Sequence, residues 1–290
     1  VGGVRTIIRA LLRKLKEVGG ERRMRCGVER IRTAGSKVEA LELDDGSVVS
    51  AGLVLSSAGL VETERLCGRE KEDQPVGRLS FVETISVYKT NPAEFGWRDT
   101  ITFFSTGRPF RYRRPEEDRV DPGSGVICIP NNYRYGESGG LKEGLVRLTA
   151  LANFDGWKEL SPEKYQEEKE KWFVALQDVA KTVLPAPLED PRPHLIARDM
   201  FTPLTVQKFT GHLGGAVYGA SRKSKDGRTA FDNLFLCGTD QGFLGIVGAM
   251  LGSLVLGLLG LTATHLVGRL IVATFGAVLL MLIVGMLKRR

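Results

Sequence analysis

The hydrophobic pattern at the start of the chain is that of an amphipathic helix. Apolar residues recur between Val4 and Leu15 at intervals of three and four, which places them on one helical face. Gly19-Gly20 ends this pattern. We therefore predict a helix over about residues 4–18, and we interpret Glu21–Val28, which follows it, as a strand.

The next segment has the pattern of a hairpin followed by a buried strand. Alternating runs within Lys37–Val49 flank Asp45-Gly46, a strong hairpin signal. Leu53-Val54-Leu55 is continuously apolar and stops at the small residues 56–59. A short buried strand that ends at small residues is typical of a parallel sheet whose edge faces a ligand.

Residues of about 78–155 alternate between apolar runs and polar turns, which predicts a second, antiparallel sheet. The best strand candidates are Leu79–Lys89, Ile101–Phe104, Val126–Ile129 and Leu145–Ala152. Ser161-Pro162 then supplies an N-cap and a first-turn proline for a helix that extends to about Val183. The segment 201–230 is rich in Gly, Thr and Ser, and we interpret it as a loop.

The end of the chain combines glycine-rich and apolar segments. We predict a buried strand over Asn233–Cys237, a turn over 238–242 and a small-residue helix over 245–261. Leu270–Leu287 carries no charge, precedes three basic residues and would span about 27 Å as a helix. We expect a membrane anchor with its basic end in the cytoplasm, although a buried or interfacial helix fits the same pattern.

Composition excludes several classes of function. The net charge of the 290-residue chain is +7, but the basic residues are scattered among acidic ones, which argues against nucleic acid and fits an anionic membrane surface better. The four cysteines lie far apart without a CxxC, so we expect buried free thiols and no metal site. The chain lacks an initiator Met and begins inside a helical pattern, so we expect it to be a fragment.

The strand, glycine turn and helix over 233–250 carry the strongest chemical signal. Glycines let a backbone approach a ligand closely, and a helix start attracts anions. A tightly packed turn without a ligand has the same spacing. The segment resembles the C-terminal FAD motif of the flavin amine oxidase superfamily, in its carotenoid desaturase, carotenoid isomerase and retinol saturase branch. The resemblance implies that Gly238 lies in the cofactor turn, that Asp240 contacts the ribityl or pyrophosphate part of FAD, and that the flavin ring lies over Gly245, Ile246, Val247, Gly248 and Ala249.

Two further stretches carry the same resemblance. The order of motifs over residues 1–65 is similar to the middle of these proteins, which implies that Val28 pairs with the adenine and Ala58 lies near the pyrophosphate. The stretch Phe201–Gly219 is similar to their loop between substrate sheet and cofactor domain. It implies substrate-side roles for His212, Tyr218 and, in the following turn, Phe243. From the residues alone, a hydrogen-bonded loop histidine is the favoured interpretation of His212.

The resemblance implies an α/β fold in which a Rossmann-like FAD-binding half is interrupted by an inserted antiparallel or mixed-sheet substrate domain. The expected divisions are 1–65 and 230–262 for FAD, 66–229 for the substrate and 263–290 for an apolar C-terminal helix. No GxGxxG opens a helix after a first strand, so the FAD site would be incomplete in this chain. No catalytic side chain stands out.

The implied activity is FAD-dependent chemistry on a lipid-soluble conjugated polyene, at a membrane, with its catalytic part in the cytoplasm or, in a plastid-bearing organism, in the stroma. Three alternatives stay open: a flavin amine oxidase, a flavin-free prenyl-binding protein of the GDP-dissociation-inhibitor type, and an inactive truncation.

Overall fold

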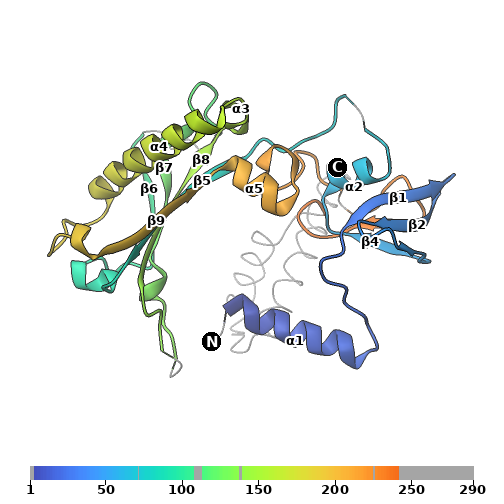
Figure 1. Ribbon diagram of the computed structural model, residues 1–290, viewed down its shortest axis with the longest axis horizontal. Coiled ribbons are helices and arrows are strands. Elements are labelled where there is room, and N and C mark those ends of the chain that lie inside the picture. The colour runs from blue at the N-terminus through green and yellow to red at the C-terminus, as the bar shows by residue number, and fades with distance from the viewer. Residues whose placement is uncertain (1–2, 71, 108–112, 137–138, 225, 242–290) are drawn as a thin grey trace, which may run out of the picture.

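The computed structural model describes residues 3–70, 72–107, 113–136, 139–224 and 226–241, and it has a mixed α/β architecture. Figure 1 shows two lobes. The smaller lobe holds the N-terminal strands together with the chain around residue 235, and the larger lobe holds a five-stranded sheet with a long helix beside it.

The smaller lobe is built from two sheets and a short helix. Strands β1 (Val28–Ala34), β2 (Lys37–Leu43) and β3 (Val48–Val49) form an antiparallel sheet. Strand β4 (Val54–Ser56) pairs in parallel with β10 (Leu234–Leu236), and helix α2 (Leu60–Leu66) follows β4. The predicted hairpin around Asp45-Gly46 and the predicted parallel strand are both confirmed. Their apolar core consists of Ile31, Val38, Val54, Phe231 and Leu234.

The larger lobe is an antiparallel sheet of order β6-β7-β8-β5-β9. Its strands, in chain order, are β5 (Ser80–Tyr88), β6 (Ile101–Ser105), β7 (Val120–Cys128), β8 (Gly144–Ala152) and β9 (Leu195–Phe201). The four predicted strands are confirmed, although β7 begins six residues earlier than expected. Strand β9 was not predicted.

One face of this sheet is covered by helix α4 (Pro162–Val183), as Figure 1 shows. The Ser161 hydroxyl accepts a hydrogen bond from the Lys164 amide, which confirms the predicted N-cap. Phe173 and Leu176 of α4 pack into the core with sheet residues and with Trp157 of the short helix α3 (Phe154–Lys158). Because side chains alternate along a strand, the residues between the core positions point to the opposite face, which α4 does not cover. We call it the uncovered face.

Two predictions about local structure are wrong. Glu21–Gly27 is not a strand, and β1 begins only at Val28. Arg25 has a φ of 55°, a left-handed conformation that an extended strand excludes. The segment 201–230 is not all loop, since α5 (Pro203–Thr210) lies within it. A capping box between Thr202 and Thr205 begins this helix, and Gly211 ends it in the left-handed region.

Helix α1 (Gly3–Glu17) confirms the first predicted helix. Its apolar residues Ile7, Ile8, Leu11 and Leu15 are exposed. No helix in the described part of the chain has the length and apolar character needed to cross a membrane. The predicted helix over 245–261 and the apolar segment Leu270–Leu287 lie outside the described residues.

Candidate functional site

The carboxyl ends of β4 and β10 lie side by side and form the first part of the candidate site. Leu236 pairs with Ser56, and the amide of Cys237 donates to the carbonyl of Ser56 at 2.8 Å. Both strands then turn at glycines with positive φ, Gly59 at 113° and Gly238 at 85°. We call residues 56–60 and 237–241 the strand-end turn. Ligands of α/β proteins bind where parallel strands end in this way.

Asp240 is the buried centre of the strand-end turn. Its side chain is fully buried, and its two carboxylate oxygens accept hydrogen bonds from three donors in two segments of the chain. The donors are the amide of Leu60 at 2.7 Å, the amide of Ala220 at 2.8 Å and the ammonium group of Lys223 at 2.7 Å. A buried carboxylate needs such donors because it has lost its hydration. The carboxylate therefore joins α2, the loop before β10 and β10 itself.

The start of α2 carries two further polar contacts. The hydroxyls of Ser56 and Thr63 are hydrogen-bonded at 2.7 Å and are both buried. Glu62, in the first turn, accepts a hydrogen bond from the amide of Leu213 at 2.8 Å. Its carboxylate also lies 3.6 Å from Nδ1 of His212. His212 therefore contacts the smaller lobe, through the first turn of α2.

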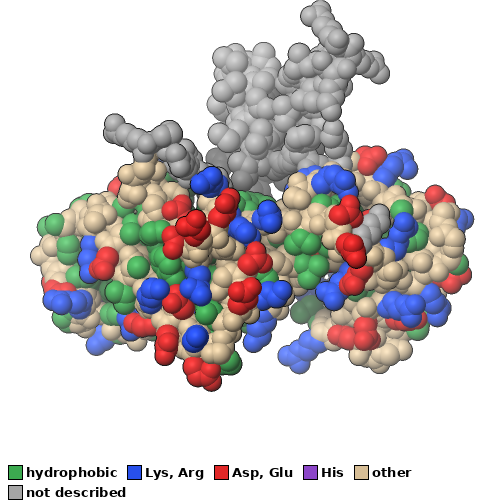
Figure 2. All heavy atoms as spheres, turned by 90° about the horizontal axis from the view of Figure 1, so that it is seen from above, with side chains coloured by type: hydrophobic (Ala, Val, Ile, Leu, Met, Phe, Trp, Pro, Cys, Tyr) green, Lys and Arg blue, Asp and Glu red, His purple; other side chains and the backbone are tan. Residues whose placement is uncertain are grey.

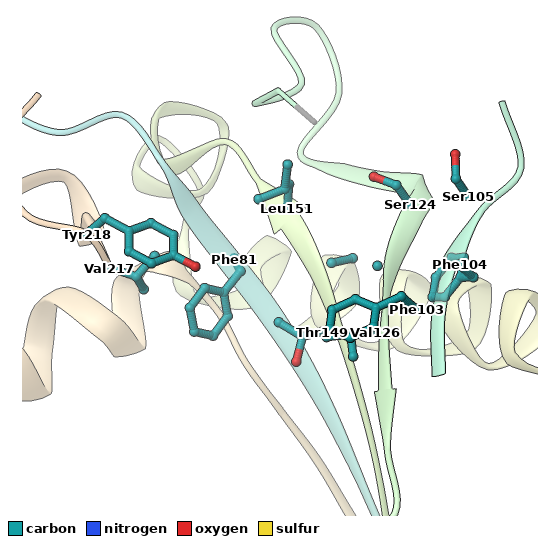
Figure 3. A pocket seen from close by; sticks show the side chains of 12 residues that line it. Phe81, Phe103, Phe104, Ser105, Ser124, Val126, Thr149, Leu151, Val217 and Tyr218 are labelled. Atoms are coloured by element: carbon teal, nitrogen blue, oxygen red, sulfur yellow. The ribbon is translucent and has the colours of Figure 1, made fainter. Parts of the chain in front are cut away.

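The second part of the candidate site is a cavity of about 450 Å³ on the uncovered face of the large sheet. Four aromatic side chains line it, from β5, from β6 and from the loop before β10: Phe81, Phe103, Phe104 and Tyr218. Figure 3 shows Tyr218 and Val217 at the end beside Phe81, with Phe103 and Phe104 at the other end. Ser105, Ser124 and Thr149 add a few hydroxyl groups. A concave, mainly apolar wall with few polar groups is typical of a small-molecule site.

An ion pair between the buried Glu83 and the partly exposed Arg147 lies on the same sheet face. Nε and Nη2 of Arg147 donate to Oε1 and Oε2 of Glu83 at 2.7 and 2.8 Å, and Thr149 donates to Oε2 at 2.9 Å. Thr149 also lines the cavity, and it pairs with Glu83 in the register of β5 and β8. The bidentate geometry fixes both side chains and thereby the wall of the cavity around Thr149.

The structure separates the predicted site residues into three groups. Ala58, Gly238 and Asp240 come together in the strand-end turn, and Val28 lies in the same lobe at the start of β1, with its side chain partly exposed. Tyr218 lines the cavity, whereas His212 contacts α2. Phe243 and the segment Gly245–Ala249 lie outside the described residues. The ligand contacts assigned to all of these residues stay predictions.

Several residues of the candidate site were not anticipated. Lys223 and Glu62 were missed because their partners are distant in sequence. Strand alternation could have identified Phe81 and Phe103, because each directly precedes a residue that packs into the core and so points to the opposite face of the sheet. Large aromatic residues on the same face of two strands of one sheet, opposite the core positions, indicate a binding face.

The cysteines are free thiols. All four are free, as expected, but they are half-buried rather than buried. Burial raises the pKa of Cys67, which follows α2, so its thiol stays protonated at neutral pH. Across the described ranges, no group of three or more His, Cys, Asp or Glu side chains is placed to bind a metal ion.

Comparison with known proteins identifies distant relatives of this chain. It is 26% identical over 256 residues to a 4,4'-diaponeurosporene oxygenase of Staphylococcus haemolyticus, which covers 82% of this chain and 49% of the relative. A 4,4'-diaponeurosporene oxygenase of Staphylococcus aureus is 23% identical with the same coverage. The chain is thus distantly homologous to these oxygenases and spans about half of their length.

The similarities to solved structures are weaker. A probable FAD-dependent monooxygenase from Pseudomonas aeruginosa aligns over 93% of this chain and 64% of its own, with a TM-score of 0.35 and 14% identity. A Diels-Alderase of pyrroindomycin biosynthesis aligns over 93% of this chain and 47% of its own, with a TM-score of 0.41 and 14% identity. At such TM-scores these likenesses support no conclusion.

A family model described as transglycosylase associated protein matches residues 243–289. The match begins just beyond Gln241, the last described residue, and includes both Gly245–Ala249 and the apolar segment Leu270–Leu287. This part of the chain therefore has two competing assignments, one to an FAD motif with an apolar tail and one to a separate family.

Proposed function

We propose that this chain provides the substrate face and part of the cofactor site of an FAD-dependent oxidoreductase that acts on a carotenoid or a related polyene. The observation that carries the proposal is the aromatic cavity on the uncovered sheet face, whose end at Tyr218 belongs to a loop bound to the strand-end turn. The distant homology to 4,4'-diaponeurosporene oxygenases supports a polyene as the occupant.

The cavity has the chemistry that a polyene requires. Phe103 is 82% exposed, although exposing a phenylalanine on a sheet face forgoes the free energy of burying it. An apolar rod on this face would cover Phe103 and Phe81 and would contact aromatic rings along its length. The few hydroxyl groups that line the cavity offer too few hydrogen bonds to replace the hydration of a charged substrate.

The strand-end turn fits one side of a dinucleotide site. Gly59 and Gly238 turn the two strands at their carboxyl ends, and at Gly238 a side chain would come only within 3.9 Å of Ser57, so the backbone there is open to a ligand. We propose that Ala58 and Gly238 face the phosphates, that Val28 faces the adenine, and that Asp240 and Gly245–Ala249 complete the site. When bound, FAD would supply the two-electron redox chemistry.

In this proposal the chain's own residues bind and orient the substrate. The aromatic wall of the cavity excludes water from the polyene, and Tyr218 bounds its end. The division into cofactor segments 1–65 and 230–262 and a substrate segment 66–229 belongs to the same proposal. So do the membrane association through 263–290 and the location of the catalytic part in the cytoplasm or stroma.

A titration with 4,4'-diaponeurosporene in detergent tests the substrate assignment. Binding would quench tryptophan fluorescence and shift the absorption bands of the polyene. We expect Phe103→Glu to weaken binding at least about tenfold, because a carboxylate on the cavity wall must be desolvated by the polyene. Phe209→Glu is the matched control, since Phe209 is 77% exposed on α5 and does not line the cavity. Equal affinities of these two variants would refute the cavity as the binding site.

FAD content tests the cofactor assignment separately. The purified chain is denatured and the supernatant is assayed for released FAD, for this chain and for a version that is extended to the full length of its oxygenase relatives. FAD in the extended version supports the proposal. Absence of FAD from both versions, together with binding of a prenyl lipid, would replace it with the flavin-free lipid-binding alternative.

A further inference from the structure

Lys223 connects the buried Asp240 to the residue that bounds the cavity. Its ammonium group donates to Oδ1 of Asp240 at 2.7 Å and also to the backbone carbonyl of Tyr218. The Lys223 side chain is 31% exposed, whereas Asp240 is fully buried. The ion pair is therefore largely shielded from solvent on the Asp240 side, where such a pair resists screening by salt.

The loop that carries Tyr218 is held from two sides. On one side, the amide of Val217 donates to the carbonyl of Leu79 at 3.1 Å, just before β5, and the amide of Ser221 donates to the carbonyl of Pro75 at 2.8 Å. On the other side, the amide of Ala220 donates to Asp240 at 2.8 Å. Tyr218 lies between these attachments.

Close packing leaves this loop little freedom. Gly219 has a φ of 65°, and a side chain at this position would come within 2.1 Å of Oδ1 of Asp240. Gly77 approaches the carbonyl of Gly219 so closely that a side chain at Gly77 would come within 1.8 Å of it. The backbone around Tyr218 is thus packed between the residues before β5 and the carboxylate at the end of β10.

From these contacts we infer that Asp240 and Lys223 are positioning residues that hold Tyr218 at the end of the substrate cavity. Asp240 binds Lys223 and Ala220, which hold the carbonyl of Tyr218 and the backbone that follows it, and the tyrosine ring lies beside Phe81 (Figure 3). The role needs no contact between Asp240 and a ligand. It rests on the proposed function only in taking the cavity as the polyene site.

Asp240 connects the strand-end turn directly to the cavity. Asp240 also holds the amide of Leu60 at the start of α2, so one carboxylate orients both the turn proposed for the cofactor and the loop of Tyr218. A displacement of the strand-end turn or of the Tyr218 loop would therefore also displace the carboxylate of Asp240. Lys223 is the member of this connection that can be replaced without leaving a cavity in the core.

A double-mutant cycle on the full 290-residue chain tests the inference, with 4,4'-diaponeurosporene as the probe. We expect Lys223→Met and Tyr218→Ala each to weaken binding roughly 3- to 10-fold, and the double variant to be no weaker than Tyr218→Ala alone. Independent losses that multiply in the double variant would overturn the positioning role. The control is Lys181→Met, which removes an exposed ion pair with Asp178 on α4, and we expect it to change binding less than twofold.

Hydrogen exchange measured by mass spectrometry, without any polyene, separates the inference from the proposed function. In Lys223→Met we expect exchange in peptides covering 217–222 to accelerate about tenfold or more, while exchange in β5 stays unchanged. Unchanged exchange in 217–222 would overturn the inference. Failure of the unmodified chain to bind the polyene, with accelerated exchange in the variant, would refute the proposed substrate and leave the positioning contacts supported.

Discussion

Two glycines with the same backbone conformation provide a sharp test of the contacts around Asp240. Gly219 and Gly211 have φ values of 65° and 76°, and alanine is strained at both. This strain costs about 1–2 kcal/mol of folding free energy. The environments differ, because a side chain at Gly211 would meet nothing within 4 Å, whereas one at Gly219 would overlap the carboxylate of Asp240.

The magnitude for Gly219→Ala follows from what Asp240 must give up. The clash cannot be relieved without moving Oδ1, which accepts hydrogen bonds from Ala220 and Lys223. Losing one charge-assisted hydrogen bond in a buried place costs about 1.5–3 kcal/mol. We therefore expect Gly219→Ala to lose about 2.5–5 kcal/mol in total, and Gly211→Ala only about 1–2 kcal/mol from backbone strain.

Urea denaturation followed by tryptophan fluorescence measures this difference. With an m-value of about 3 kcal/mol/M, the midpoint of Gly219→Ala should lie about 0.5–1 M below that of Gly211→Ala. Midpoints within about 0.1 M of each other would show that Gly219 does not pack against Asp240. The arrangement of the loop, and with it the positioning role of Lys223, would then be refuted.

Two further predictions concern charged groups outside this loop. Arg147→Met should destabilise the chain by about 1.5–3 kcal/mol in urea denaturation, because it leaves the buried Glu83 with Thr149 as a donor but without its cation. The double variant with Glu83→Gln should recover most of that loss, and equal stability of the single and double variants would contradict this. The exposed Asp190 has a pKa lowered to about 2, mainly by its hydrogen bond with the Arg192 side chain. Because this pKa is depressed in the folded state, the carboxylate stabilises the fold at pH values above its ordinary pKa, and this contribution is lost as the pH falls through about 2. A carboxyl NMR titration should therefore give a midpoint near pH 2 for Asp190 that rises in Arg192→Gln, and an ordinary midpoint in the unmodified chain would exclude the pair.

Signals that are local in the sequence gave correct predictions. The spacing of apolar residues in α1, the cap and proline at the start of α4, and the Asp45-Gly46 turn each act through neighbouring residues. The apolar run at β4 predicted a buried parallel strand and the run at β10 a buried strand. The two strands do pair in parallel, but in β4 only Val54 and Ser56 are buried, and Leu55 is exposed. These features follow from helix periodicity, strand burial and turn chemistry, which need no knowledge of distant contacts.

The features that were missed depend on distant partners or on competing local signals. Strand β9 has almost no buried residues and so lacks alternation, yet β5 pairs with it across more than a hundred residues. Helix α5 is short, and its cap at Thr202 and end at Gly211 were outweighed by the glycine-rich composition around it. At Arg25 a positive φ ended what the polarity pattern had suggested was a strand.

For the candidate site, the sequence alone determined which turn holds the polar centre, because glycines and an aspartate after a buried strand are a local pattern. Only the tertiary structure decided what Asp240 binds, since Leu60 reaches it from the start of α2, and Ala220 and Lys223 from the loop before β10. The cavity was likewise decided by the sheet register, which brings Phe81 and Phe103 to one face from strands that are not neighbours in the sheet. A carboxylate buried away from water must find its donors wherever the folded chain offers them, and no local rule specifies where those donors come from.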